Sequence, residues 1–202
     1  MKIICIGRNY ADHAAEMGSS VPSEPMVFMK PPSALMIGNK PLYYPGFTEN
    51  LHYEGELVLK VCKNGRHVQP EHARSYYNQV AFGIDFTARD LQARCKEKGH
   101  PWEIAKGFDN SAAVSEFISL EDFKVNEISF ETRINGDIVQ SGHTQDLIFS
   151  FDTLICHISK FFKLQQGDII FTGTPAGVGP VKIGDLIEGY IQGNKMMYCE
   201  IR

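Results

Sequence analysis

The sequence predicts a single mixed α+β domain, mostly β, in which a few helices cover the strands. Its 202 residues suit one large domain. Eighteen glycines and ten prolines supply many tight turns, and thirteen phenylalanines and eight tyrosines favour strands. Two runs of alternating polarity meet at Asn135-Gly136, a strong signal for a β-hairpin. We therefore expect one strand-rich unit over residues 1–202.

The first part of the chain contains one predicted helix after a short strand. Residues 2–6 form the strand, and Asn9 then caps a helix over Tyr10–Met17 that stops at Gly18. A loop rich in serine and proline follows at 19–25. Beyond it, a short apolar run lies at 26–29, turns fill 41–50, and strand signals lie at 51–61 and 79–86.

A second helix and the hairpin lie in the middle of the chain. Thr87, with Asp90 three residues later, marks the start of a helix over 88–98, and Gly99 marks its end. The hairpin covers 127–140, because its two alternating runs flank the Asn-Gly turn.

The most regular helix begins at Ser150. Its apolar residues recur at the helical spacing and should all pack on the sheet: Phe151, Leu154, Ile155, Ile158, Phe161 and Phe162. Short strands at 168–172, 185–192 and 195–201 complete the predicted fold.

The charge balance excludes several kinds of partner. Twenty Lys and Arg residues against 24 Asp and Glu residues give a net charge of −4. Nucleic acids and anionic membranes favour a basic surface, so neither is an expected partner. The chain has no run of about 18 uninterrupted apolar residues, which a membrane-spanning helix would need.

The N-terminus and the cysteines indicate a cytoplasmic protein. The apolar run Ile3–Ile6 is too short for a signal peptide. The five cysteines are odd in number and form no C-x-x-C motif, which argues against a zinc ribbon and a disulfide framework. Four of them lie in apolar surroundings, so we expect buried free thiols of a reducing compartment.

Two acidic residues lie two positions apart in the predicted strand 51–61. The side-chain period of a strand is two, so Glu54 and Glu56 project from one face, about 7 Å apart along the chain. Two adjacent carboxylates repel each other, and a bound cation removes the conflict. Oxygen ligands favour Mg²⁺ or Mn²⁺ over zinc. The alternative is a solvated edge strand whose glutamates face water.

Asp85 ends the next apolar strand, just before the predicted helix start at Thr87. Arg89 and Gln92 lie three residues apart on that helix and share a face, which would meet whatever Asp85 contacts. Arg89 could then clamp a carboxylate. The alternatives are that Asp85 only caps the helix and that Arg89 is an ordinary surface charge.

A loop rich in glycine and threonine follows the predicted strand 168–172. The hydroxyls and glycine amides of residues 171–180 can form a nest that binds an anion. The spacing matches neither a P-loop nor a dinucleotide-binding fingerprint, so a nucleotide is not indicated. The alternative is a tight connecting loop without a ligand.

His13 and Glu16 lie three residues apart on the first predicted helix. Glu16 can hydrogen-bond one imidazole nitrogen of His13 and orient the other toward a water molecule. A surface pair at this spacing also arises by chance. Gly18, Ser19 and Ser20 could form a hinge, so we expect residues 10–25 to be a mobile lid over a substrate.

Six motifs extend these observations along nearly the whole chain. They are G-R-N-Y-A-D-H-A-A-E at 7–16, F-M-K-P-P at 28–32, H-Y-E-G-E at 52–56, G-I-D-F-T-A-R-D-L-Q at 83–92, K-E-K-G-H-P-W-E-I-A-K-G-F-D at 96–109 and G-D-I-I-F-T-G-T-P-A-G-V-G-P at 167–180. In their order and spacing they resemble the fumarylacetoacetate hydrolase (FAH) family. The chain looks most similar to its short, single-domain acylpyruvase and oxaloacetate decarboxylase branch.

The resemblance implies an FAH-type β-roll or sandwich around one divalent ion per chain, Mg²⁺ or Mn²⁺, in a homodimer. By motif position, the metal ligands would be Glu54, Glu56 and Asp85, the catalytic residues His13, Glu16 and Lys106, and the substrate-binding residues Lys30, Arg89, Gln92 and Thr174. Gly55 departs from the pattern, because close relatives often carry a larger apolar residue there. It faces away from the metal, so the departure concerns local packing.

The resemblance also implies an activity. The expected reaction is metal-dependent cleavage of a C–C bond in a small 2-oxo or diketo acid, through a metal-stabilised enolate. It would be acylpyruvate hydrolysis, oxaloacetate decarboxylation or both. An alternative is isomerisation or tautomerisation of 2-oxo/2-hydroxy-diene acids or of oxaloacetate. A metal-stabilised binding module without turnover is the alternative of another class, but it would give Lys106, Arg89 and the His13–Glu16 pair no purpose.

Overall fold

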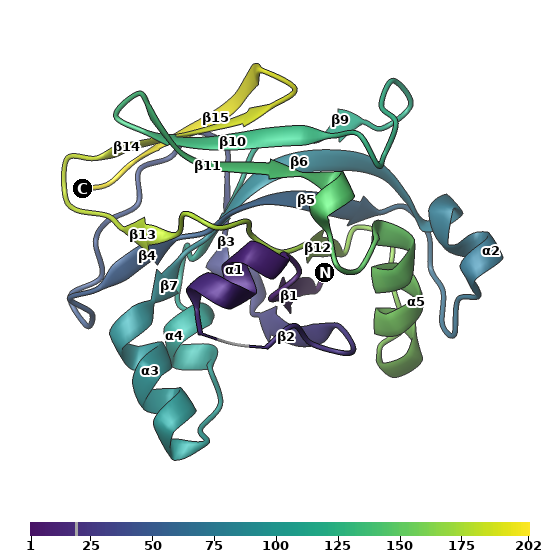
Figure 1. Cartoon of the computed structure of the whole chain (residues 1–202), viewed down its shortest axis with the longest axis horizontal. Helices are drawn as coiled ribbons and strands as arrows, with labels where there is room; N and C mark the ends of the chain where they lie inside the picture. The colour runs from purple at the N-terminus through teal and green to yellow at the C-terminus, as the bar shows by residue number, and fades with distance from the viewer. Residues whose placement is uncertain (19) are drawn as a thin grey trace.

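A computed structural model describes residues 1–18 and 20–202. Its largest sheet has eight strands (Figure 1). The mainly stranded α+β fold predicted from the sequence is confirmed. In spatial order the large sheet contains β2 (Met26–Lys30), β1 (Ile3–Gly7), β12 (Ile169–Phe171), β5 (Gly55–Val61), β6 (Tyr77–Asp85), β8 (Ala112–Val114) and β3 (Leu35–Ile37), with β9 (Ile118–Ser119) paired to β6.

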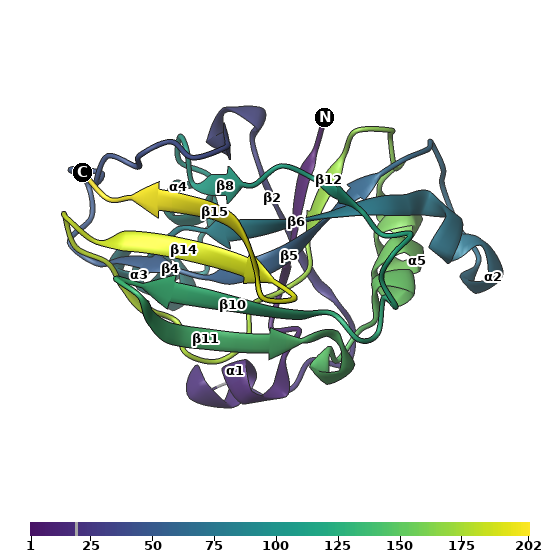
Figure 2. The same cartoon turned by 90° about the horizontal axis from the view of Figure 1, so that it is seen from above.

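A four-stranded sheet lies alongside the large one (Figure 2). It contains, in spatial order, β11 (Asp137–His143), β10 (Ser129–Ile134), β14 (Leu186–Ile191) and β15 (Asn194–Glu200). A small third sheet contains β13 (Gly179–Pro180), β4 (Leu51–Tyr53) and β7 (Thr87–Ala88). The described helices are α1 (Ala11–Glu16), α2 (Pro70–Ala73), α3 (Arg89–Lys98), α4 (Glu103–Lys106) and α5 (Phe151–Phe161).

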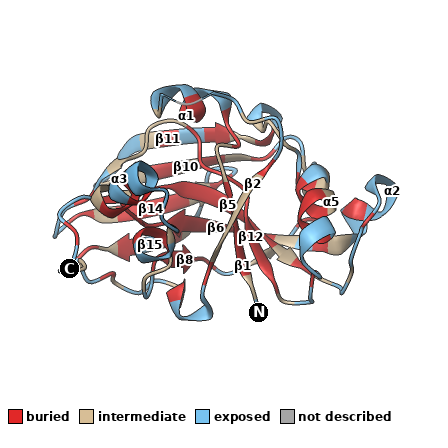
Figure 3. Ribbon diagram, turned by 90° about the horizontal axis from the view of Figure 1, so that it is seen from below, coloured by how far each residue is buried: buried red, intermediate tan, exposed pale blue. Residues whose placement is uncertain are grey.

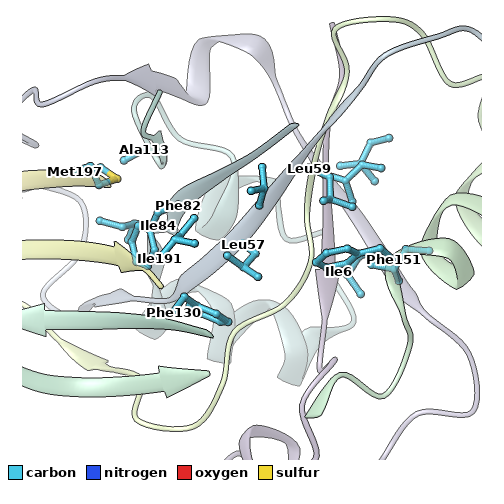
Figure 4. Close-up of a cluster of buried hydrophobic side chains, with 14 of the residues drawn as sticks. Ile6, Leu57, Leu59, Phe82, Ile84, Ala113, Phe130, Phe151, Ile191 and Met197 are labelled. Atoms are coloured by element: carbon cyan, nitrogen blue, oxygen red, sulfur yellow. The ribbon is translucent and has the colours of Figure 1, made fainter. Parts of the chain in front are cut away.

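Alternation along β5 and β6 divides their side chains between two faces of the large sheet. Leu57 and Phe82 face the four-stranded sheet, where the Phe82 and Phe130 rings meet edge to face at 6.4 Å (Figure 4). Glu56 precedes Leu57 by one residue and Asp85 follows Phe82 by three, so both carboxylates lie on the opposite face. The main core and the acidic residues are therefore separated by the thickness of one sheet.

The predicted hairpin is confirmed. Antiparallel β10 and β11 are joined at Asn135 and Gly136, whose φ angles of 53° and 93° are both positive. A two-residue turn with both φ angles positive matches the twist of the flanking strands, and Asn-Gly is the pair best suited to it.

Asn9 is not the cap of α1, contrary to the prediction. Tyr10 precedes the helix, and no side chain caps it. The buried Asn9 amide instead accepts a hydrogen bond from the Phe149 N–H at 2.7 Å and donates to the Phe149 and Thr172 carbonyls at 3.0 and 2.8 Å. Because this amide joins two distant segments, it is not available to the helix.

Thr87 does not cap the following helix either. It lies in β7, and α3 begins at Arg89 without a side-chain cap. The Asp90 carboxylate accepts hydrogen bonds from the Thr48 hydroxyl at 2.6 Å and the Glu49 N–H at 3.2 Å. Pairing with β4 extends the strand structure over two residues that the local pattern assigns to the start of the helix.

The end of the α5 stripe also differs from the prediction. Its first four apolar residues are buried in the main core, but Phe161 and Phe162 are 60% and 36% exposed. The two rings lie against each other, and Phe161 also contacts His157. Figure 3 shows this change from a buried to an exposed surface along α5.

All five cysteines are free thiols, as expected, but three rather than four are buried: Cys5, Cys95 and Cys199. Within the described residues, no helix is long and apolar enough to cross a membrane.

Candidate active site

Three buried carboxylates converge where β4, β5 and β6 meet. Glu54, Glu56 and Asp85 are at most 6% exposed, and each offers an oxygen within 4.8 Å of the others. The antiparallel pairing of β5 and β6 fixes this arrangement, and the Asp85 N–H donates to the Glu54 carbonyl at 2.8 Å. Two residues predicted from strand spacing and one from a strand end therefore form one cluster.

Three cationic side chains surround the carboxylates. The Lys106 ammonium lies 2.8 Å from Glu54 Oε2 and 2.9 Å from Asp85 Oδ2. Arg89 Nη2 lies 2.7 Å from Glu54 Oε1, and Lys30 Nζ lies 2.7 Å from Asp85 Oδ1. Three positive charges thus balance three negative charges in a space that excludes most water.

Of the three clustered carboxylates, Glu56 makes no contact with a cationic side chain of the described residues. Its Oε2 accepts a hydrogen bond from the Gly173 N–H at 2.7 Å. Burial raises the pKa of Glu56 well above its usual range, and the negative charges of Asp85 and Glu54 raise it further. A cation placed among the three carboxylates would relieve this repulsion.

For Glu54 and Lys106, the charges of neighbouring groups outweigh the effect of burial on the pKa. Burial would raise the pKa of Glu54, but the charges of Lys106 and Arg89 outweigh it and hold the pKa well below its usual range. Burial likewise would lower the pKa of Lys106, whereas Asp85 and Glu54 keep it above the ordinary value. Both groups are therefore charged at neutral pH.

The donor set fits a hard divalent cation. It consists of carboxylate oxygens alone, the type of ligand that Mg²⁺ and Mn²⁺ prefer. The buried Asp85 Oδ1 accepts no hydrogen bond within the described residues, although Lys30 Nζ lies 2.7 Å away as an ion-pair partner. An ion held by these three carboxylates would keep coordination positions open for a substrate.

A pocket opens directly on the three carboxylates. Eight of the ten residues predicted for the site line it: His13, Glu54, Glu56, Asp85, Arg89, Gln92, Lys106 and Thr174. Arg89 and Gln92 share a face as expected, because Arg89 Nη1 donates to Gln92 Oε1 at 2.8 Å. Sequence reasoning missed eight further lining residues, namely Ile6, Gly7, Arg8, Met17, Met26, Phe28, Lys96 and Trp102.

Lys30 lies behind Asp85 and does not line this pocket. It is 3% exposed, and its ammonium donates to the carbonyls of Phe86, Lys106 and Ser111. Lys30 therefore holds Asp85 and the chain around Lys106 in place, and its contact with a substrate stays a prediction of the resemblance.

Helix α1 carries the His13–Glu16 pair against the loop after β12. His13 Nδ1 lies 3.3 Å from Glu16 Oε2, so the predicted contact is present. The Gly177 N–H donates to both Glu16 oxygens, at 3.2 and 3.3 Å. Tyr53 donates its hydroxyl hydrogen to the Gly177 carbonyl at 2.8 Å. Glu16 thereby joins His13 to the loop that contains Thr174.

Gln140 of β11 is a second-sheet residue that sequence reasoning missed. Its Oε1 accepts hydrogen bonds from the Gly55 N–H at 2.9 Å and the Thr132 hydroxyl at 3.0 Å. Its Nε2 donates to Thr174 Oγ1 at 2.7 Å and to the Pro175 carbonyl at 3.0 Å. All four hydrogen-bonding positions of the amide are used. A polar residue at an inward position of the hairpin was the only sequence signal.

The close packing of Gly55 against Thr132 and Gln140 leaves no room for a side chain at position 55. A Cβ at Gly55 would lie 2.0 Å from Thr132 Oγ1, closer than real contacts allow. The Thr174 hydroxyl donates to the Gly55 carbonyl at 2.9 Å, so Gly55, Gln140 and Thr174 form a closed ring of hydrogen bonds. The unusual glycine between the two glutamates is thus a packing feature, as the sequence suggested.

Comparison with known proteins identifies the class to which this fold and site belong. Residues 2–201 match the family described as fumarylacetoacetate (FAA) hydrolase C-terminal, and the chain belongs to that family. It is 45% identical over 192 residues to human "Oxaloacetate tautomerase FAHD1, mitochondrial", covering 95% of this chain and 87% of that protein.

Two further relatives bear on the chemistry. The chain is 40% identical over 194 residues to "Oxaloacetate decarboxylase, mitochondrial" of Dictyostelium discoideum, covering 95% of this chain and 89% of that protein. Fumarylpyruvate hydrolase from Pseudomonas aeruginosa, solved in complex with Mn²⁺ and pyruvate, superposes with a TM-score of 0.95 at 37% identity. That alignment covers 100% of this chain and 89% of the other.

Proposed function

We propose that this protein is a divalent-metal-dependent enzyme that cleaves a C–C bond in small 2-oxo acids. Its reactions would be hydrolysis of acylpyruvates to pyruvate and a carboxylic acid, decarboxylation of oxaloacetate, or both. The observation that carries the proposal is the buried carboxylate cluster at the base of a pocket lined by His13 and Lys106. Relatives named for decarboxylation and for fumarylpyruvate hydrolysis support it.

In this proposal Glu54, Glu56 and Asp85 hold Mg²⁺ or Mn²⁺. When bound, the ion acts as a Lewis acid toward the 2-oxo and carboxylate oxygens of the substrate. Lys106 and Arg89 add positive charge near the negative charge that develops on the pyruvate fragment.

His13 supplies the proton transfers. Oriented by Glu16, it removes a proton from a water molecule that attacks the distal carbonyl carbon. The C–C bond then breaks, its electron pair passes to C3 of the pyruvate fragment, and that carbon is protonated. Oxaloacetate loses CO₂ from the same position without an attacking water. Gln92 and Thr174 line the pocket and contact the substrate.

The first test is the release of pyruvate from acetylpyruvate and from oxaloacetate. Turnover of at least one substrate should require Mg²⁺ or Mn²⁺ and should stop when EDTA is added. Rates equal to those of a protein-free control with the same ion, for both substrates, would favour a binding module without turnover.

Glu56→Gln is the sharpest variant for the metal site. Because Glu56 has no cationic contact, the substitution leaves no buried cation unpaired and should preserve the fold. Removing a ligand should weaken Mn²⁺ binding by more than the roughly 10–100-fold that loss of a supporting residue costs. Isothermal titration with Mn²⁺ measures this, and the exposed Glu121→Gln is the matched control. Unchanged Mn²⁺ affinity in Glu56→Gln would exclude Glu56 as a ligand.

Tautomerisation of oxaloacetate is the second candidate activity, because a relative at 45% identity carries that name. His13 could move a proton between C3 and the 2-oxygen without breaking the C–C bond. Loss of the ultraviolet absorbance of the enol without release of pyruvate would identify this reaction.

Assembly and location remain predictions of the sequence. We infer one catalytic unit, because the pocket draws on residues from Ile6 to Thr174. Light scattering tests the homodimer, and fractionation of the source cells tests the cytoplasmic location.

A further inference from the structure

Two cationic side chains in the pocket lack the carboxylate partners that the others have. Arg89 and Lys106 both pair with Glu54, but Arg8 and Lys96 make no ion pair within the described residues. Arg8 follows β1, and Lys96 lies on α3. Both are more exposed than the buried carboxylates, so they line the outer part of the pocket.

These two charges face a common space. Lys96 Nζ lies 5.5 Å from the centre of the Trp102 ring, which also lines the pocket. Burial lowers the pKa of Lys96, and the positive charges of Arg8 and Arg89 lower it further. Because like charges in a confined space repel each other, an anion between Arg8 and Lys96 would be bound favourably.

The backbone at Arg8 has an unusual conformation. Its φ of 57° lies in the left-handed region, which is strained for a residue with a side chain. The next residue, Asn9, holds this conformation through its hydrogen bonds to Phe149 and Thr172. A strained residue that the surrounding structure holds in place, and whose side chain lines a pocket, is typical of a functional position.

We propose that Arg8 and Lys96 form a subsite for the distal carboxylate of a 2-oxo dicarboxylate. The guanidinium of Arg8 can hold a carboxylate through two hydrogen bonds, and Lys96 adds a second charge. The 2-oxo end of the same molecule lies at the Glu54–Glu56–Asp85 cluster. This inference rests on the proposed function and deepens it, because it selects substrates with an anionic group at each end.

A matched pair of substrates tests the subsite. Fumarylpyruvate and acetylpyruvate undergo the same hydrolysis, but only fumarylpyruvate has a distal carboxylate. In Arg8→Met, the ratio of kcat/KM for fumarylpyruvate to kcat/KM for acetylpyruvate should fall about 10–100-fold, the loss expected for a charge-assisted hydrogen bond. Arg8→Lys should recover part of the ratio, and Lys96→Met should lower it less. Arg94→Met, on an exposed position of α3, is the control and should leave the ratio unchanged.

Binding without turnover gives a second readout. Trp102 is the only tryptophan, so its fluorescence reports on this pocket. With Mn²⁺ present, 2-oxoglutarate should bind more tightly than 2-oxopentanoate, which has the same chain length and no distal carboxylate. Arg8→Met should reduce this preference.

The outcomes separate the two proposals. Turnover of neither acylpyruvate nor oxaloacetate by the unsubstituted protein would overturn the proposed function. Hydrolysis of acetylpyruvate with a substrate ratio that Arg8→Met leaves unchanged would overturn the subsite alone.

Discussion

Gly55, a residue without a side chain, separates the two glutamates of the carboxylate cluster and fixes the backbone between them. The N–H of Gly55 is bound by Gln140 and its carbonyl by Thr174, so both backbone groups between Glu54 and Glu56 are fixed. The Gln140 amide belongs to the other sheet and reaches the site through Gly55 and Thr174. Gln140 is therefore a positioning residue, since it does not line the pocket itself.

Gln140→Met tests this role. The substitution keeps most of the volume but leaves the buried Gly55 N–H without its partner, which should cost about 1–3 kcal/mol of the free energy of unfolding. Mn²⁺ affinity should fall about 10-fold or more, as for loss of a supporting residue. Urea unfolding and Mn²⁺ titration, the latter under conditions where both proteins are folded, measure the two effects. The exposed Gln145→Met is the control. Lower stability with unchanged Mn²⁺ affinity would show that Gln140 stabilises the fold but does not position the carboxylates.

Sequence reasoning succeeds for residues whose chemistry follows from local spacing. Glu54 and Glu56 share a face because of the strand period, and His13 and Glu16 meet because of the helix period. It fails for Gln140 and Arg8, because their partners lie on other elements or are charges in a shared pocket. The resemblance placed Lys30 at the substrate site, and only the folded chain shows that its ammonium pairs with Asp85 and that Lys30 does not line the pocket.

At the scale of elements, the Glu16 carboxylate links α1 to the loop after β12. Glu16 accepts from Gly177, and α1 lies beside β11 in Figures 2 and 3. The helix is only six residues long, and His13 and Ala14 are its buried residues, so the surface that holds it on the site is short. The predicted lid over 10–25 includes Ser19, which lies outside the described residues.

Hydrogen exchange tests the lid. With Mg²⁺ present, oxalate should slow exchange in peptides that cover residues 10–18, because a ligand in the pocket favours the closed position of α1. Peptides from α5, which lies outside the pocket, provide the control. Equal exchange in residues 10–18 with and without oxalate would contradict a mobile lid.

His13→Ala should separate the two bond-cleaving reactions. Acylpyruvate hydrolysis needs an activated water, and loss of a general base typically costs about 100–10,000-fold in rate. Oxaloacetate decarboxylation needs no attacking water and should fall less. Pyruvate release from both substrates at saturating Mg²⁺ measures the difference. Equal losses would show that His13 acts in a step common to both.

The boundaries of helices and strands were predicted best where a local sequence signal, such as a turn dipeptide, sets them. The β10–β11 hairpin follows from the two positive φ angles that Asn135-Gly136 accommodates. The helices α1 and α3 start within one residue of their predicted positions, but the predicted caps were wrong, because Asn9 and Thr87 are used by tertiary contacts and strand pairing instead. Phe161 and Phe162 fit the helical period, but periodicity does not reveal where the surface beneath a helix ends.

At the scale of the whole molecule, Tyr77 joins the large sheet to α5. Its hydroxyl donates to Asp152 Oδ1 at 2.8 Å, and its ring meets that of Phe151 edge to face. Burial raises the pKa of Tyr77, and the hydrogen bond and charge of Asp152 raise it further. The folded protein thus holds the phenolic proton more tightly than the unfolded chain does.

This difference predicts how stability changes at high pH. A raised folded pKa contributes stability that is complete below the unfolded value of about 10 and is lost as pH rises above it. Tyr77→Phe should cost about 1–2 kcal/mol of unfolding free energy at neutral pH. That deficit should shrink as the pH rises from about 9 to about 11, because only the unsubstituted protein has this phenol to ionise. Urea unfolding at each pH measures the deficit, and a constant value would rule out the linkage.

The balance of three cations against three carboxylates has a consequence for the order of events in the cell. Small metal domains often stay unfolded until their ion arrives, since nothing else neutralises the ligands. Here Lys30, Arg89 and Lys106 already pair with Asp85 and Glu54, and within the described residues only Glu56 of the three carboxylates lacks a cationic partner, so we expect the chain to complete its core before an ion arrives. In this order of events the ion would load onto the folded protein. We then expect the supply of each ion to influence whether magnesium or manganese is bound, and we expect exchange of the ion without refolding.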